Sequence, residues 1–224
     1  MCIRDSYKRV YDKGRGPNTG GMGSYSPPTF WNSILDNLIL QDILLPTLKG
    51  LKQEGIIYKG ILYVGLIITT EGPKVLEFNC RFGDPECQVI LPRLKTDLID
   101  VILSVIDQTL TQNTVNWCPQ TSIGVVMASK GYPGAFEIGY QISGLETLDS
   151  KHLVFHSGTK KQICKASKET KLVTAGGRVL TVVSLAEDLN KAKDLAYKGV
   201  KKIEFTDSFY RTDIGESNQA NQST

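Results

Sequence analysis

A short turn between two apolar runs limits the folds that this chain can adopt. The runs read GILYVGLIIT (60–69) and PKVLEFN (73–79), and the turn TEGP (70–73) lies between them. Both runs are rich in the β-branched residues that favour strands. Because so short a connection can join only antiparallel neighbours, the sequence predicts a β-hairpin over residues 60–79.

Helices are predicted on both sides of this hairpin. Apolar residues recur at helical spacing over 29–55, where Pro46 is expected to kink or split the helix and Gly55 to end it. A second amphipathic helix is predicted over 96–110, with Thr96 or Asp97 as its cap. Residues 7–28 show no hydrophobic period, so they are predicted to form a loop.

The second half of the chain changes to short strands separated by glycines. Strands are predicted over 122–129, 152–158, 171–176 and 178–185, and one late helix over 185–203. The polar stretch 111–120 is the predicted boundary between two units, which extend over 7–115 and 120–215. Residues 1–6 are expected to be a non-native leader, and 216–224 a disordered tail. The fold class is α+β.

Composition excludes some classes of protein. The 224 residues carry a net charge of +3, which is too slight to indicate a nucleic-acid or membrane partner. Five cysteines are scattered without a CxxC pair, which favours a reducing, cytoplasmic compartment.

The end of the hairpin carries the first candidate site. Glu77 and Asn79 lie two residues apart on a strand, so their side chains share one face, while Leu76 and Phe78 face the other way. If the apolar face is buried, the acid and the amide need a role of their own. Their oxygens are suitable ligands for Mg²⁺. The alternative is that both point into water from an edge strand.

The loop after this strand adds charged groups. Arg81 offers a planar set of donors for a phosphate or a carboxylate, and Asp84 and Glu86 flank Pro85. Arg81 and Asp84 are candidates for catalysis, and a weak surface ion pair between them is the alternative.

A glycine-rich loop, GPNTGGMG (16–23), is the second candidate site. Glycines allow backbone N–H groups to turn toward an anion. The loop is not a Walker A motif, because no Lys-Ser/Thr pair follows the last glycine. An anion-binding loop and a solvated basic loop beside Lys8, Arg9 and Lys13 therefore remain alternatives.

Taken together, these segments resemble the phosphoribosylamine–glycine ligase family of ATP-grasp enzymes. The resemblance rests on YKRV, GPNTGGMGSYSP, EFNCRFGDPE, GVVMASKGYPG, VFHSGTK, TAGGRVLTVVSL and YRTDIG, in order from Tyr7 to Gly215. It implies the second half of an ATP-grasp domain, an antiparallel sheet with helices, followed by a small C-terminal domain of mixed strands.

The resemblance also implies a reaction and site roles. ATP, glycine and 5-phosphoribosylamine would give glycinamide ribonucleotide, ADP and phosphate through glycyl phosphate, a step of purine biosynthesis. Glu77 and Asn79 would hold Mg²⁺, or Mn²⁺, on the ATP phosphates, and Arg81 and Asp84 would lie by the transferring phosphoryl group. The substrate pocket would be shaped by Asn18, Thr19, Gly20, Gly21, Met22 and Gly23. The full-length parent is expected to be monomeric.

The sequence departs from the family in what it lacks. Relatives carry an N-terminal domain and the front half of the ATP-grasp domain, with the lid over ATP and the adenine pocket, and this sequence shows neither. We therefore expect the chain alone to be inactive as a ligase. Two alternatives remain: another ATP-grasp carboxylate–amine ligase, and a non-catalytic nucleotide-binding module.

Overall fold

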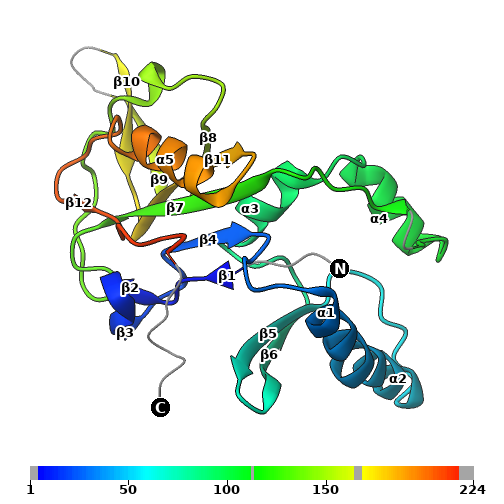
Figure 1. Cartoon of the computed structure of the whole chain (residues 1–224). Coiled ribbons are helices and arrows are strands. Elements are labelled where there is room, and N and C mark those ends of the chain that lie inside the picture. Colours follow the sequence, from blue (N-terminus) through cyan, green and yellow to red (C-terminus); the bar gives the residue numbers. More distant parts are fainter. Residues whose placement is uncertain (1–4, 112–113, 164–167, 217–224) are drawn as a thin grey trace. The chain divides into compact units, whose positions relative to one another are not determined.

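The computed structural model describes residues 5–111, 114–163 and 168–216 (Figure 1). They form two compact units. Unit 1 comprises Met1–Pro27, Asp84–Arg93 and Pro119–Thr224, and unit 2 comprises Pro28–Gly83 and Leu94–Cys118. This division differs from the predicted boundaries of 7–115 and 120–215, because two segments of the first half pack with the strands of the second half.

Unit 1 is built on one antiparallel sheet in the order β1-β4-β7-β11-β8, with β12 also paired to β7. The strands are β1 (Asp5–Ser6), β4 (Gly23–Ser26), β7 (Thr121–Ser129), β8 (Leu153–His156), β11 (Arg178–Ala186) and β12 (Ser208–Phe209). The central pair, β7 and β11, is buried along nearly its whole length. Continuous apolar runs of this kind are typical of strands covered on both faces.

One helix, α5 (Leu189–Val200), packs against the central strands, as Figure 1 shows. Asp188 caps it, because its Oδ1 accepts a hydrogen bond from the Lys191 amide at 2.9 Å. The helix buries the small residues Ala192, Ala196 and Gly199, which allows close approach to the sheet. The main apolar core of the described residues lies in unit 1.

The N-terminal segment of unit 1 is not the loop that the sequence predicts. It forms β2 (Arg9–Tyr11), the short helix η1 (Asp12–Gly14), β3 (Arg15–Asn18) and the fully buried β4. The expectation was wrong because β4 reads GSYS, in which Tyr25 is the single apolar residue and no hydrophobic period can be seen. Asp5 and Ser6, expected to lie in a leader, form β1 against β4. The expected tail overlaps the described part of the chain only at Glu216.

The remaining elements of unit 1 are short. They are α3 (Cys87–Ile90), η3 (Leu91–Arg93), η5 (Leu145–Thr147), and the hairpin of β9 (Thr159–Ile163) and β10 (Thr170–Thr174). The predicted strands over 122–129, 152–158, 171–176 and 178–185 correspond to β7, β8, β10 and β11, and the late helix to α5.

Unit 2 contains the predicted hairpin, β5 (Tyr63–Thr69) and β6 (Gly72–Asn79), and helical segments. The predicted helix over 29–55 consists of α1 (Ser33–Ile39), a π-helical turn η2 (Leu40–Leu44) and α2 (Leu45–Gln53). Pro46 lies in the first turn of α2, directly after the π-helical turn that interrupts the α-helical segments. Gly55 ends the helix with φ +74°.

The second predicted helix of unit 2 is α4 (Leu98–Ile106), and Asp97 is its cap, with 2.7 Å between its Oδ1 and the Ile99 amide nitrogen. The predicted α+β class is confirmed, with antiparallel sheets and few helices. No helix in the described ranges is long and apolar enough to cross a membrane.

Candidate substrate and metal site

The hairpin places Glu77 and Asn79 on one face, as the spacing predicts. Asn79 pairs with Tyr63 and Glu77 with Gly65, and the register shifts only beyond this point, between Glu77 and Val75. Glu77 lies over Gly65, where an added Cβ would come 2.9 Å from its Cγ. A glycine opposite the acid thus leaves space for the Glu77 side chain.

The opposite face of β6 differs from expectation. Leu76 is 64% exposed and Phe78 is 47% exposed, so this chain does not bury its apolar face. A buried apolar face opposite Glu77 and Asn79 was one reason to expect that these two residues bind a metal. Within this chain that face is exposed, so this reason does not hold.

The two side chains suit a hard cation without forming a complete site for it. Among the described residues, no group of three or more His, Cys, Asp or Glu side chains is placed to hold a metal ion. Glu77 and Asn79 supply one carboxylate and one amide oxygen. Mg²⁺ is commonly held by one or two carboxylates together with substrate phosphates and water. This donor set fits a Mg²⁺ that arrives with a nucleotide.

Asp84 has partners that the sequence did not indicate. Its Oδ1 accepts a hydrogen bond from Gln88 Nε2 at 2.8 Å, and its Oδ2 accepts one from Arg178 Nη2 at 3.1 Å. The carboxylate is nevertheless 46% exposed. It is therefore held in a fixed orientation while a face remains open to solvent. Arg81 is exposed, and its Nη1 donates to the Phe82 carbonyl at 2.9 Å.

Arg178, at the start of β11, joins the glycine-rich loop to the Asp84 loop. Its Nη1 donates to the carbonyls of Gly20 at 2.8 Å, Gly21 at 3.3 Å and Asp84 at 2.8 Å. The side chain is 19% exposed. One guanidinium thus holds two candidate segments of unit 1 together, a geometry suited to its planar fork of donors.

The backbone amides of the glycine-rich loop are already engaged. Thr19 N donates to Lys8 O, Gly20 N to Tyr132 Oη, Gly21 N to Thr19 Oγ1 and Met22 N to Tyr7 O, at 2.8–2.9 Å. An anion would have to displace one of these bonds in order to use the loop as an amide cradle. The structure therefore gives no direct support to anion binding by these four amides.

The glycines of this loop instead allow close packing. Gly21 has φ +114°, and an added Cβ would come 2.5 Å from Pro85 Cδ. A Cβ at Gly20 would lie 2.9 Å from Arg178 Cζ, and one at Gly23 would lie 2.7 Å from the Gly124 carbonyl. Met22 is completely buried, whereas Asn18 and Gly20 are exposed and Thr19 is half-buried. The accessible part of the predicted substrate loop is therefore Asn18–Gly20.

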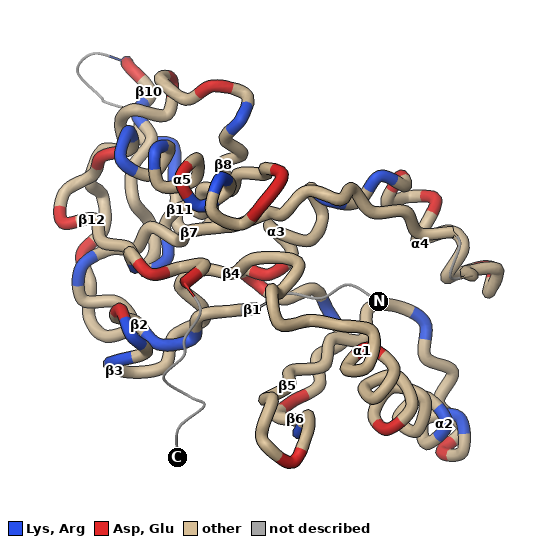
Figure 2. Tube along the Cα trace, viewed as in Figure 1, with Lys and Arg blue, Asp and Glu red and all other residues tan. Residues whose placement is uncertain are grey.

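Basic residues surround the neighbouring β2–β3 hairpin, as Figure 2 shows. Beneath them, Arg211 is completely buried and forms a bidentate pair with Asp213, with contacts of 2.7 and 2.6 Å. Its Nη1 also donates to the Arg9 carbonyl at 3.0 Å. Burial by itself raises the pKa of the Asp213 carboxyl, but hydrogen bonds from Arg211 and from the Lys13 amide outweigh it and lower that pKa below its usual value.

A pocket of about 260 Å³ lies beside this pair, lined by Val10, Tyr11, Asp12, Arg15, Phe209, Tyr210 and Arg211. Its charged groups are engaged within the protein. Asp12 accepts hydrogen bonds from the Thr212 amide and hydroxyl, at 2.8 and 2.5 Å, and Arg211 is paired with Asp213. These hydrogen bonds hold the YRTDIG segment (210–215) against the β2–β3 hairpin within unit 1.

Cys87, next to the Asp84 loop, is not suited to act as a nucleophile. Burial, followed by the neighbouring carboxylates of Asp84 and Glu86, raises the pKa of its thiol. The thiolate is therefore disfavoured.

Family models match two parts of the chain. Residues 1–87 match the phosphoribosylglycinamide synthetase ATP-grasp (A) domain, and residues 122–217 match the C domain of the same synthetase. Phosphoribosylamine–glycine ligase of Halalkalibacterium halodurans is 48% identical over 215 residues, which cover 96% of this chain and 48% of that protein. The trifunctional purine biosynthetic protein adenosine-3 of Gallus gallus is 51% identical over 217 residues, covering 96% of this chain and 21% of that protein.

Solved structures show the same fold. Phosphoribosylamine–glycine ligase of Thermotoga maritima superposes with a TM-score of 0.80 at 35% identity, over 94% of this chain and 50% of that one. The biotin carboxylase domain of a thermophilic 2-oxoglutarate carboxylase gives a TM-score of 0.62 at 14% identity, over 92% of this chain and 43% of that one, a likeness of fold alone. The chain spans about half the length of the curated single-function relatives that it matches.

Proposed function

The chain belongs to the phosphoribosylglycinamide synthetase family, and from this premise we propose that it is part of a ligase that joins glycine to 5-phosphoribosylamine. The glycine carboxylate attacks the γ-phosphorus of ATP, which gives glycyl phosphate and ADP. The amine of phosphoribosylamine then attacks the acyl carbon, phosphate leaves, and glycinamide ribonucleotide forms. Such phosphoryl transfer depends on positioning and charge neutralisation more than on covalent catalysis.

Glu77 and Asn79 are the proposed metal ligands. Their shared face on β6 and their oxygen donors support this role. A bound Mg²⁺, or Mn²⁺, would neutralise charge on the ATP phosphates. Glu77 contributes the carboxylate, and Asn79 contributes an amide oxygen two residues along the strand.

Arg81 and Asp84 are proposed to act on the transferring group and the substrates. The exposed Arg81 guanidinium retains donors for a phosphoryl or carboxylate oxygen. Asp84 keeps an open face while Arg178 and Gln88 orient its carboxylate. Within the glycine-rich loop, the accessible residues Asn18, Thr19 and Gly20 are proposed to contact substrate. The buried residues Gly21–Gly23 are proposed to hold them in position by packing against neighbouring segments.

One observation carries this proposal. A match at 48% identity extends over 215 residues, or 96% of the chain, so the matched length is long enough to span both the Glu77–Asn79 strand and the glycine-rich loop. We also propose a reducing, cytoplasmic compartment, because the five cysteines of the sequence are scattered without a CxxC pair.

A chimera tests the proposal. This chain replaces the 215 matched residues of the Halalkalibacterium halodurans relative, and ATP-dependent phosphate release is measured with glycine and phosphoribosylamine. We expect release only when both substrates are present, and no release from the 224-residue chain alone.

Each other result has a defined meaning. Turnover by the chain alone would contradict the proposal that it is only part of the ligase. A chimera that prefers a different amino acid or amine would indicate another ATP-grasp ligase. A folded, inactive chimera beside an active parent would favour the non-catalytic nucleotide-binding module.

A further inference from the structure

Two segments that carry the family resemblance, GVVMASKGYPG (124–134) and TAGGRVLTVVSL (174–185), have no part in the reaction proposed above. The first contains most of β7 and the loop that follows it. The second contains the loop that precedes β11 and most of β11 itself. Because these two strands are antiparallel neighbours, with Arg178 opposite Ala128, the two loops meet at one end of the sheet of unit 1.

Backbone contacts hold these two loops together. Ser129, the last residue of β7, donates from its amide to the Gly177 carbonyl at 2.8 Å and from its hydroxyl to the Gly176 carbonyl at 3.0 Å. The chain then turns at Gly131, which has φ +96° and where an added Cβ would come 2.0 Å from a backbone carbonyl oxygen. The amide of Tyr132 closes this turn on the Ser129 carbonyl at 3.1 Å.

The ring of Tyr132 lies over a glycine. A Cβ added at Gly177 would come 2.3 Å from Tyr132 Cδ2, so only a glycine leaves space for the ring there. Phe136 packs against the ring edge-on, with 6.4 Å between the ring centroids. Tyr132 is half-buried and does not belong to the main apolar core of the described residues. Core packing therefore does not explain its position.

The hydroxyl of Tyr132 reaches the glycine-rich loop. Its oxygen accepts a hydrogen bond from the Gly20 amide at 2.9 Å, and Arg178 Nη1 donates to the carbonyl of the same glycine at 2.8 Å. A glycine has no side chain that could anchor it, so its two peptide groups determine where it lies. Both groups of Gly20 are thus held by the region that matches the C domain, residues 122–217.

The other amides of this loop are bound by nearby residues. The amide and hydroxyl of Thr19 both donate to the Lys8 carbonyl at 2.8 Å, and the Met22 amide donates to the Tyr7 carbonyl at 2.8 Å. Gly20 lies between these anchors, in the accessible part of the loop. Removing the Tyr132 hydroxyl would release its N–H group to water and leave this part of the loop free to rotate.

We propose that Tyr132, placed by Gly177, is a positioning residue for the substrate site. Its hydroxyl oxygen fixes the Gly20 amide and thereby holds Asn18–Gly20 in the conformation that binds the non-nucleotide substrates, glycine or phosphoribosylamine. The identity of the substrates rests on the proposed function, whereas the hold of Tyr132 on Gly20 does not.

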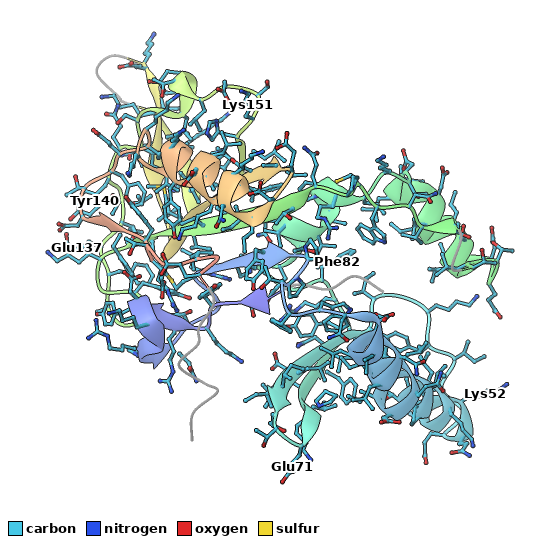
Figure 3. The ribbon with its side chains drawn as sticks, viewed as in Figure 1. Lys52, Glu71, Phe82, Glu137, Tyr140 and Lys151 are labelled. Atoms are coloured by element: carbon cyan, nitrogen blue, oxygen red, sulfur yellow. The ribbon has the colours of Figure 1, made fainter. Side chains whose placement is uncertain are left out.

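Tyr132→Phe tests the proposal, because it keeps the ring and removes only the acceptor. Tyr140→Phe is the matched control. Tyr140 is also half-buried and lies eight positions further along the chain, but its hydroxyl donates to the Glu137 carboxylate; both residues of this pair are labelled in Figure 3. Hydrogen exchange of the Gly20 amide is measured in the 224-residue chain, and KM and kcat for each substrate are measured in the chimera described above.

We expect Tyr132→Phe to speed exchange of the Gly20 amide by at least about threefold, and to raise KM for glycine or for phosphoribosylamine by about fivefold, as the loss of one net hydrogen bond predicts. KM for ATP should not change, and the midpoint of urea unfolding should equal that of Tyr140→Phe. A residue that merely stabilises the fold would not produce this difference between the substrates. Tyr140→Phe should match the parent in every measurement.

A second variant tests how the ring is placed. Gly177→Ala keeps the hydroxyl but displaces the ring, so we expect it to raise the same KM. Tyr132→Phe should then add little in the Gly177→Ala background, because both changes break one contact. If Gly177→Ala does not fold, Tyr132→Phe decides without it.

Three results would overturn the proposal. One is a Tyr132→Phe chain in which the Gly20 amide exchanges as it does in Tyr140→Phe. The second is a rise in KM for ATP as large as the rise for the other substrates. The third is full additivity of Tyr132→Phe and Gly177→Ala. A chimera that is inactive with Tyr132 intact would instead contradict the proposed function, and exchange at Gly20 would still decide whether Tyr132 holds the loop.

Discussion

At the scale of single residues, Arg178 determines how two candidate loops are held. Its guanidinium donates to three backbone carbonyls and to the Asp84 carboxylate. The sequence could not have indicated this, because 94 positions separate Arg178 from Asp84 and each residue resembles an ordinary surface charge. Glu77 and Asn79 could be paired from sequence because the two-residue period of a strand is local.

Replacing Arg178 tests its positioning role. Arg178→Gln removes the donor shared by three carbonyls, of which the Gly21 carbonyl lies in a part-buried contact, so we expect the free energy of unfolding to fall by roughly 1–3 kcal/mol. The amide of Gly20, which donates to Tyr132, should exchange faster as the loop loosens. Urea denaturation and hydrogen exchange measure these effects. Arg15→Gln, at an exposed arginine with one long hydrogen bond, is the control, and equal effects in both variants would contradict the role.

A second residue-scale prediction concerns Gly21. Gly21→Ala combines a φ of +114° with a Cβ 2.5 Å from Pro85, so we expect a loss of roughly 2–4 kcal/mol in thermal or urea unfolding. Gly14→Ala has φ +65° but nothing within 4 Å, so it isolates the backbone cost of about 1 kcal/mol. Similar losses in the two variants would show that packing against Pro85 is unimportant.

At the scale of elements, strand β4 explains why the N-terminal half of unit 1 was not predicted. Long apolar runs made β7 and β11 recognisable, but β4, which lies inside the sheet, has two serines and a glycine beside its one apolar residue, Tyr25. Its buried Ser24 donates to the Pro85 carbonyl at 3.1 Å, and its buried Ser26 accepts a hydrogen bond from Arg93 at 2.6 Å. These partners come from distant segments, so tertiary contacts, not local pattern, determine this strand.

The stability that Asp213 contributes, as part of the contact between the YRTDIG segment and the β2–β3 hairpin, should depend on pH. Because the pKa of Asp213 is lowered in the folded protein, its contribution to stability is fully present above the ordinary value of 3.8 and is lost as pH falls through the folded pKa. Asp213→Asn should therefore be destabilising at pH 7, and its difference from wild type should shrink below pH 3.8.

Unfolding by urea between pH 7 and pH 3 measures this difference. Asp194→Asn, at an exposed position of α5, is the control. A difference between Asp213→Asn and wild type that stays constant across this range would contradict an ionised, paired Asp213.

At the scale of the whole molecule, the candidate residues are divided between the two units. Glu77, Asn79 and Arg81 belong to unit 2, whereas Asp84 and the glycine-rich loop belong to unit 1. Sequence motifs identified both groups, but motifs carry no information on how much apolar surface each unit buries. Only the exposure of the described side chains shows that unit 2 leaves most of its large hydrophobic residues accessible to solvent.

The central claim is that the hairpin of unit 2 supplies the metal ligands of a ligase, and one measurement tests it most directly. Phosphate release by the chimera is titrated with Mg²⁺ for Glu77→Gln and for Glu71→Gln. Glu71 is an acid at the turn of the same hairpin, paired with Lys74 and labelled in Figure 3. We predict that Glu77→Gln lowers kcat by at least about a hundredfold or shifts the Mg²⁺ requirement upward, because a carboxylate ligand is lost. Glu71→Gln should match the parent chimera, and unchanged Mg²⁺ dependence in Glu77→Gln would contradict the claim.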